Sequence, residues 1–192
     1  MNQKKTIGLV FIDQFADWEF GLLSGSAVEW FGAHIVSLAP SKGPLKSIGG
    51  LHLVPDRGLD VAENADLDAI AVIGANTWPS QDAPDISQLL RSVLSRGGIV
   101  GGICGGTLAL ARAGLFEGGK HTSNGAGWIE ANIGGYAGSS LYQDVPHAVH
   151  DGHIISAPGT FAVSFLGAIL PDKAAEIAEM RGFIAREYEI AS

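Results

Sequence analysis

A single cysteine, flanked by glycines at the end of a strand-like run, constrains the fold of this 192-residue chain more than any other feature. The apolar run Ile99–Ile103 leads directly into Cys104, and the helix-forming run 107–113 follows. This pattern predicts a strand, a tight turn and a helix, and the flanking glycines permit a strained turn and close approach of a ligand. We therefore predict a reactive thiol at a sheet edge, where the N–H groups of a helix N-terminus favour the thiolate. An inert packed cysteine is the alternative, because free cysteines are often simply buried.

Strand and helix patterns alternate along most of the chain. The predicted strands are 7–12, 34–39, 51–54, 67–73 and 99–103, with a hairpin over 147–156. The predicted helices are 17–31, 84–96, 107–113, 128–132, 161–170 and 173–187. Alternation of this kind predicts an α/β fold with a mostly parallel sheet and helices on both faces. The length and the absence of a linker predict one domain over 1–192.

Composition excludes several classes of partner. The formal net charge is −8, which argues against nucleic acid or an anionic membrane as a partner. No apolar run approaches the roughly 18 residues of a membrane-spanning helix. One cysteine cannot form an internal disulfide, so we expect a reducing, cytoplasmic location.

Two carboxyl groups follow the first predicted strand. Asp17 is expected to cap the helix that begins there, because a carboxylate accepts the unpaired N–H groups of a first turn. Glu19 lies between Trp18 and Phe20, in an apolar setting. Burial there lets a carboxyl keep its proton and donate a hydrogen bond to a thiolate. Glu19 is therefore our candidate acid or base beside Cys104.

Four stretches together resemble the ThiJ/PfpI family, the intracellular protease-like branch of the class I glutamine amidotransferase-like superfamily. They are residues 16–19, 72–76, 102–106 and 157–160. The resemblance implies a flavodoxin-like three-layer sandwich, a homodimer and a nucleophile-elbow cysteine at Cys104. It also implies that Glu19 hydrogen-bonds that thiol, and that the backbone N–H groups of Ala75 and Gly105 bind an oxyanion.

The chain departs from the family's hydrolytic members at the expected histidines. Gly105 stands where protease-like members have a histidine, and Asn124 occupies the place of the histidine that other members use. His121 lies three residues earlier, and in a strand an odd offset would turn it to the opposite face. The segment 156–159 lacks the late His-x-Glu of glutamine amidotransferases. A complete triad is therefore not evident, which weakens the case for proteolysis and glutamine hydrolysis.

Several other polar and aromatic residues are candidates for lining a substrate pocket. They are Asp17, Asn76, Trp78, His121, Ser123 and Asn124, although packing alone would equally explain Trp78. His150 and His153 would face each other across a turn at Asp151 and Gly152, but no third ligand is visible. We therefore predict no metal and no cofactor.

The sequence leaves three functions open. The first is a cysteine-dependent enzyme acting on a small carbonyl or amide substrate through Cys104 and Glu19. The resemblance implies amide hydrolysis, glyoxalase-type chemistry or isonitrile hydration; the missing histidine weakens the first two and leaves isonitrile hydration open. The second is a non-enzymatic redox or stress-response protein in which Cys104 is oxidised to sulfenic or sulfinic acid. The third is a dimeric scaffold with a vestigial thiol. We expect a small-molecule substrate and a second copy of the chain as partners.

Overall fold

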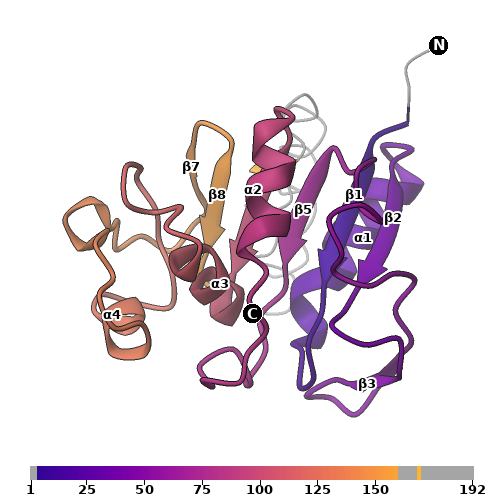
Figure 1. The fold of residues 1–192 in the computed structure, drawn as a ribbon, viewed down its shortest axis with the longest axis horizontal. Helices are drawn as coiled ribbons and strands as arrows, with labels where there is room; N and C mark the ends of the chain where they lie inside the picture. The colour runs from indigo at the N-terminus through magenta and orange to yellow at the C-terminus, as the bar shows by residue number, and fades with distance from the viewer. Residues whose placement is uncertain (1–3, 160–167, 170–192) are drawn as a thin grey trace, which may run out of the picture.

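A six-stranded sheet organises the computed structural model, which describes residues 4–159 and 168–169 (Figure 1). The strand order is β2-β1-β5-β6-β8-β7. Its strands are β1 (Thr6–Val10), β2 (His34–Leu38), β5 (Ala69–Val72), β6 (Ile99–Ile103), β7 (Val149–Asp151) and β8 (Ile154–Ala157). All pairs are parallel except β7 with β8. The mostly parallel sheet and flavodoxin-like architecture predicted from the sequence are confirmed.

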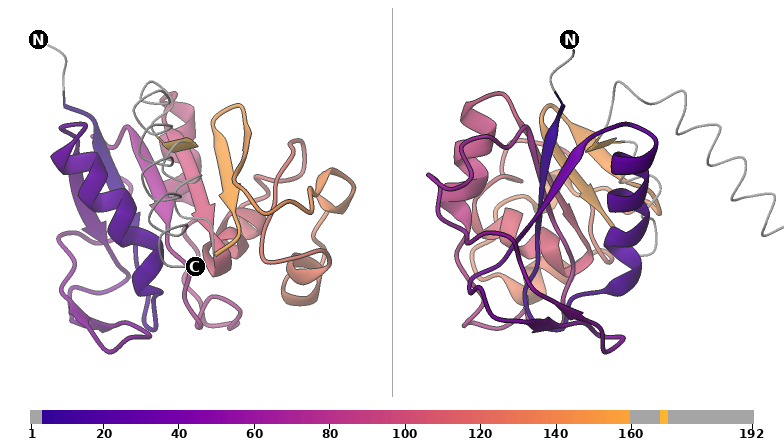
Figure 2. Two further views of the ribbon diagram at one scale, coloured as in Figure 1. Left: turned by 180° about the vertical axis from the view of Figure 1, so that it is seen from behind. Right: turned by 90° about the vertical axis from the view of Figure 1, so that its right-hand side faces the viewer.

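Helices lie on both faces of the sheet. Figure 2 shows α1 (Asp17–Glu29) on one face and α2 (Ser87–Ser95) on the other. The remaining elements are β3 (Leu45–Lys46), β4 (His52–Leu53), η1 (Cys104–Gly106), α3 (Thr107–Arg112), α4 (Trp128–Asn132) and η2 (Ser139–Leu141). The helices predicted over 161–170 and 173–187 fall outside the described residues, except for 168–169. None of the helices in the described part of the chain is long and apolar enough to cross a membrane.

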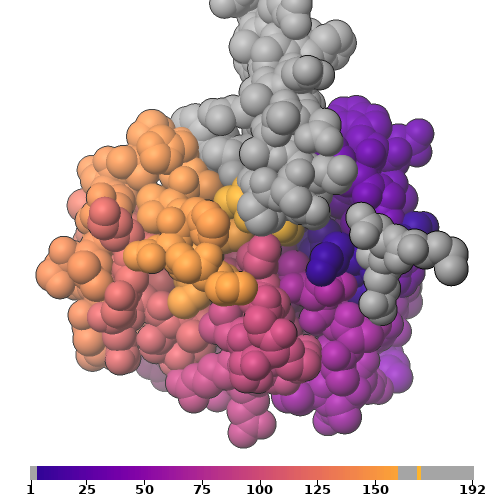
Figure 3. All heavy atoms as spheres, turned by 90° about the horizontal axis from the view of Figure 1, so that it is seen from above, coloured from indigo at the N-terminus to yellow at the C-terminus, as the bar shows by residue number. Residues whose placement is uncertain are grey.

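The three central strands supply most of the core. In β1, β5 and β6 almost every residue is buried, as continuous apolar runs require when both faces of a sheet are covered. Figure 3 views the end of the sheet at which β1 begins, with the orange atoms of later residues and the violet atoms of early residues on opposite sides. The carboxyl ends of β1, β5 and β6 therefore meet at the other edge, where parallel α/β sheets bind ligands.

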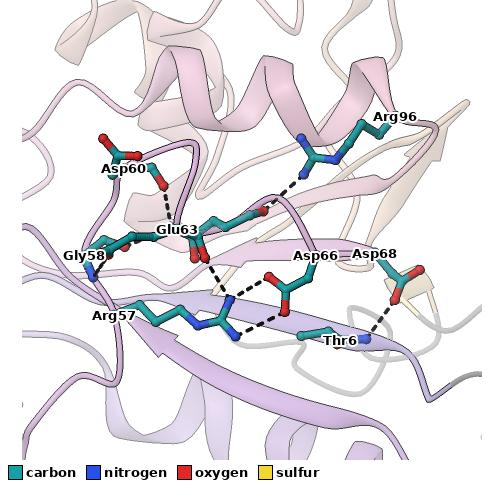
Figure 4. Close-up of polar contacts among 9 residues, drawn as sticks. Thr6, Arg57, Gly58, Asp60, Glu63, Asp66, Asp68 and Arg96 are labelled. Carbon is teal, nitrogen blue, oxygen red and sulfur yellow. Dashed lines mark hydrogen bonds and ion pairs between the residues drawn. The ribbon is translucent and has the colours of Figure 1, made fainter.

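A polar network fixes the approach to β5 (Figure 4). The Arg57 guanidinium binds both carboxylate oxygens of Asp66, at 2.6 and 3.1 Å. The backbone N–H of Thr6 donates to Asp68 at 2.8 Å, which ties the start of β1 to the residue before β5. These bonds fix the position of β1 relative to β5. The candidate site lies at the opposite ends of these two strands.

The turn after β6 lies directly against β5 because two of its residues lack side chains. A Cβ atom at Gly106 would stand 2.2 Å from the Val72 carbonyl oxygen, and one at Gly105 would stand 2.8 Å from the Ala75 carbonyl oxygen. Both distances are far below van der Waals contact with backbone that cannot move aside. Only glycine at these positions lets the turn at Cys104 approach the end of β5.

This close approach predicts an unequal effect of two glycine substitutions. Gly106→Ala should lower the free energy of unfolding by about 2–3 kcal/mol, because the new methyl group must displace backbone. Gly21→Ala in α1 is the control, since no atom lies within 4 Å of its Cβ position and alanine favours a helix. Urea unfolding followed by circular dichroism measures both. Equal changes for the two variants would contradict the packing argument.

Candidate active site

Cys104 lies at a strained turn between β6 and α3. Its φ is +53°, a left-handed conformation that costs a residue with a Cβ about 1–2 kcal/mol. The Thr107 hydroxyl donates a 2.6 Å hydrogen bond to the Cys104 carbonyl oxygen, which stabilises the turn from the helix side. The side chain is half-buried. The strand-turn-helix expected around the cysteine is therefore present, with the strand bounds as predicted.

Glu19 reaches the same place from α1. It is fully buried, and its Oε2 accepts a 2.7 Å hydrogen bond from the backbone N–H of Gly74, beyond the end of β5. Its other oxygen, Oε1, is buried and has no hydrogen-bond partner among the described residues. The carboxyl group is thus anchored by one oxygen and free to act with the other.

Two glycines leave the space in which the acid and the thiol meet. A Cβ at Gly74 would lie 2.7 Å from Glu19 Oε1 and 2.8 Å from the Cys104 Cβ. A Cβ at Gly159 would lie 2.8 Å from the Cys104 sulfur and 3.0 Å from Glu19 Oε1. The unbonded carboxyl oxygen and the sulfur therefore share one small space, closed by backbone on two sides.

Burial shifts both ionisations in this space upward. Loss of solvent raises the pKa of the Glu19 carboxyl from 4.5 to about 7, against the lowering effects of the Gly74 N–H and the Cys104 thiol. Burial, and then the negative charge of Glu19, raise the pKa of the Cys104 thiol to about 11. The predicted preference for thiolate is therefore wrong for the isolated protein. The six-residue helix α3 does not outweigh desolvation and a neighbouring carboxylate.

Asn124 contacts the sulfur from a loop on the other side. Its Nδ2 donates to Cys104 Sγ at 3.2 Å, and its Oδ1 accepts from the Gly159 N–H at 3.3 Å. The second bond fixes which end of the amide faces the sulfur. The bond to Nδ2 lowers the Cys104 pKa, but an amide neither gives up nor takes a proton near neutral pH.

The two residues whose N–H groups are expected to bind an oxyanion lie close to each other, and the N–H of Gly105 contacts the thiol. The Ala75 N–H has no hydrogen-bond acceptor among the described residues. The Cβ position of Gly105 is 3.2 Å from the Ala75 nitrogen, and the Gly105 N–H interacts with the thiol and lowers its pKa. Two donors at this place are what a developing oxyanion needs.

His121 is not part of this constellation. It is fully buried and stacked on Phe116 with ring centroids 4.2 Å apart. One ring nitrogen bonds the Gly119 carbonyl oxygen at 2.8 Å and the other bonds the Tyr136 hydroxyl, and burial lowers its pKa. All six histidines are among the described residues, and none of their hydrogen bonds reaches Cys104.

Most other pocket candidates are occupied elsewhere. Trp78 is fully buried and its indole N–H donates to the Ile73 carbonyl oxygen at 2.8 Å, which is a packing role. Asn76 is exposed beside Ala75. Ser123 is buried, and its hydroxyl forms a 2.7 Å hydrogen bond with the Thr107 hydroxyl, so it supports the turn at Cys104 through Thr107.

Asp17 does not cap α1, contrary to the sequence prediction. The helix follows Ala16, whose extended backbone carries no capping side chain. The Asp17 carboxylate instead accepts the Gly49 N–H at 2.7 Å and bonds Ser47, which lowers the Asp17 pKa. It therefore ties the loop after β3 to the start of α1.

The expected juxtaposition of His150 and His153 is also wrong. The register pairs Asp151 with Ile154, so the two-residue turn is Gly152 and His153, one residue later than predicted. His150 then lies opposite Ile155. Within 4–159 and 168–169, no three His, Cys, Asp or Glu side chains gather as metal ligands would.

Sequence reasoning missed two supporting residues. The Trp18 indole N–H donates to the Gly159 carbonyl oxygen at 2.9 Å and holds that backbone over the sulfur. Thr107 bonds the carbonyl three residues earlier, a local pattern that its spacing from Cys104 makes recognisable.

Known proteins share both this sequence pattern and the fold. The family model described as the DJ-1/PfpI family matches residues 5–171. An uncharacterised protease, YoaZ, of Bacillus subtilis is 30% identical over 175 residues, covering 88% of this chain and 83% of that one. A glutathione-independent glyoxalase, DJR-1.2, of Caenorhabditis elegans is 27% identical over 95 residues, covering 49% of this chain and 51% of that one.

A solved structure extends the match over nearly all of the chain. The DJ-1 superfamily protein Atu0886 of Agrobacterium tumefaciens superimposes with a TM-score of 0.87 at 32% identity, covering 95% of this chain and 99% of that one. With the family match over residues 5–171, these likenesses establish that the chain belongs to the DJ-1/PfpI family.

Proposed function

We propose that this protein is a cysteine-dependent enzyme that acts on a small, reactive carbonyl compound such as a 2-oxoaldehyde. One observation carries the proposal: a buried carboxyl, Glu19, directs an unbonded oxygen at the Cys104 sulfur and has a pKa of about 7. A proton carrier works best when its pKa lies near the working pH. The glyoxalase named among the relatives is consistent with this chemistry.

The first step is addition of the thiol to the aldehyde carbon. Glu19 as carboxylate takes the S–H proton while a carbon–sulfur bond forms and the carbonyl π electrons move to oxygen. The N–H groups of Ala75 and Gly105 stabilise that oxyanion, a contribution of about 3 kcal/mol for one such donor. Glu19 then returns the proton to the oxygen, which gives a hemithioacetal.

The remaining steps need no external oxidant. Glu19 removes the proton from the carbon bonded to sulfur, and a proton returns to the neighbouring carbon. The hydroxyl proton of the hemithioacetal passes to the oxygen of that neighbouring carbon, which becomes an alcohol as the first carbon becomes a thioester, so one carbon is oxidised while the other is reduced. Water then cleaves the thioester, releases a 2-hydroxy acid and restores the thiol.

The same geometry makes amide hydrolysis the weaker candidate. An amine leaves only when it is protonated, and the ring hydrogen bonds of His121, His147, His150 and His153 go to groups other than Cys104. Asn124 stands beside the sulfur and does not titrate. The half-buried sulfur also lies against the Gly159 backbone, which favours a compact substrate over an extended peptide.

A redox function is the second candidate, and the unbonded Glu19 oxygen favours it. In its protonated form this oxygen can donate a hydrogen bond to an oxygen added to the Cys104 sulfur, which would stabilise a sulfinic acid. In that case the thiol would be consumed by peroxide and would not turn over.

Turnover separates the two candidates. We expect purified protein to convert methylglyoxal to lactate with kcat/KM rising with pH through about 7, as Glu19 loses its proton. Cys104→Ser should abolish turnover, and Glu19→Gln should reduce it by about 100-fold or more. Lactate is measured by chromatography, and a peptide amide serves as the comparison substrate. No lactate, together with a stable gain of two oxygens on Cys104 after graded peroxide, would reject the enzyme.

The raised pKa of Glu19 also predicts how stability depends on pH. Because the folded value of about 7 exceeds the ordinary 4.5, the protonated acid stabilises the fold below pH 4.5, and this contribution is lost as the pH rises through 7. The loss amounts to roughly 3 kcal/mol. Glu19→Gln does not titrate, so its stability relative to the parent should rise by that amount between pH 4 and pH 8.

Urea unfolding of both proteins at several pH values measures this difference, and other ionisable groups cancel in the comparison. Asp17→Asn is the matched control, because its carboxyl pKa is lowered instead and its relative stability should not rise over this range. A constant difference between Glu19→Gln and the parent would show that Glu19 is not the buried proton carrier.

A further inference from the structure

The loop that carries Asn124 is held by one phenol oxygen. The backbone N–H groups of Ser123 and Gly125 both donate to the Tyr142 hydroxyl oxygen, at 3.2 and 3.1 Å. These two residues flank Asn124 in the chain. A phenol oxygen has two acceptor positions, so both bonds can form at once.

Asn124 depends on this support because it is exposed. Within the described residues its side-chain hydrogen bonds go to the Cys104 sulfur and to the Gly159 N–H, and both are over 3 Å long. Gly125 has a φ of +141° and no atom within 4 Å of its Cβ position, so packing does not fix the loop there either. The position of the amide nitrogen is therefore set by the backbone.

Tyr142 itself is fixed at a defined place. It follows η2, and its backbone N–H bonds the Ser139 carbonyl oxygen at 3.3 Å. The next N–H, of Gln143, bonds the His121 carbonyl oxygen at 2.7 Å, and the Tyr142 ring meets the His121 ring edge-on with centroids 5.8 Å apart. The buried His121 therefore anchors the segment that presents the phenol.

We propose that Tyr142 is a positioning residue for the thiol: its hydroxyl clamps the amides on both sides of Asn124 and so holds the Asn124 amide nitrogen against the Cys104 sulfur. Tyr142 acts through Asn124 and touches no reacting atom. The effect on turnover rests on the proposed function. The effect on the thiol does not, because an alkylating reagent reports it directly.

The test is the pH profile of Cys104 alkylation by iodoacetamide, followed by intact mass. Tyr142→Phe removes only the oxygen, so Asn124 should stabilise the thiolate less. We expect the profile to move to higher pH and the rate at pH 8 to fall about 3- to 10-fold, which corresponds to a shift of half to one pH unit. Glu19, the ionisable group beside the thiol, is unchanged in every variant.

Tyr136→Phe is the matched control. It also removes a phenol oxygen from the aromatic cluster around His121, but the Tyr136 hydroxyl bonds His121 and not the loop 123–125. Its alkylation profile should match that of the parent. If Tyr136→Phe and Tyr142→Phe behave alike, the effect is general loosening of the cluster and the proposal is wrong.

A double-mutant cycle identifies the route. Asn124→Ala should shift the profile by a similar amount, and adding Tyr142→Phe to it should change nothing more. Additive shifts would show that Tyr142 acts independently of Asn124, which overturns the proposal.

Amide hydrogen exchange in the unaltered protein keeps the proposal testable even if a variant fails to fold. The Ser123 and Gly125 amides should be protected, and exchange at the rate of a free amide would exclude the clamp. A clamp found in a protein that does not turn over methylglyoxal would reject the proposed function and leave this inference standing. Turnover of methylglyoxal by a protein whose Ser123 and Gly125 amides are unprotected would reject this inference and leave the proposed function standing.

Discussion

Backbone contact between the turn at Cys104 and the end of β5 is the constraint on which the site depends. Gly105 and Gly106 bring the turn so close that any side chain would strike the carbonyl oxygens of Val72 or Ala75. This proximity places the Cβ of Cys104 beside Gly74, whose N–H also holds Glu19. The strained φ of Cys104 is therefore sustained by packing on the strand side and by Thr107 on the helix side.

Local sequence patterns predicted the parts of the fold that are buried and formed by one continuous stretch of chain. The strand Ile99–Ile103 and the helix Trp128–Asn132 have the predicted bounds, and α1 ends two residues early. The strand Leu45–Lys46 was not predicted, because two residues carry no periodicity and this pair is defined by its partner, β4. The turn of the β7–β8 hairpin was misplaced by one residue, and a slip of one residue changes which side chains face each other.

The candidate site was predictable only in part, for a physical reason. Cys104 carries a local signal in its glycines, whereas the bond from Gly74 to Glu19 and the bond from Asn124 to the Cys104 sulfur join segments far apart in the chain. The position of Asn124 followed from the family resemblance and not from spacing. Tyr142 gave no signal, since its role is visible only once the loop folds back onto it. The ionisation of the thiol was predicted wrongly because a sequence pattern shows a helix start but not the depth of burial.

The electrostatics of the pair formed by Glu19 and Cys104 limit the chemistry of the site more than the identity of the nucleophile does. Burial raises the pKa of the Glu19 carboxyl to about 7 and that of the Cys104 thiol to about 11, so near neutral pH the carboxyl titrates while the thiol keeps its proton. The Asn124 amide stabilises negative charge on sulfur without supplying or accepting that proton. Addition to an aldehyde followed by an internal proton shift needs only one such carrier, because each proton taken is returned before the next step. Amide hydrolysis must protonate a poor leaving group while a base activates water, which a single carboxyl does less readily. An asparagine where other family members have a histidine is therefore consistent with the proposed carbonyl isomerisation, in which the buried acid would set the working pH range.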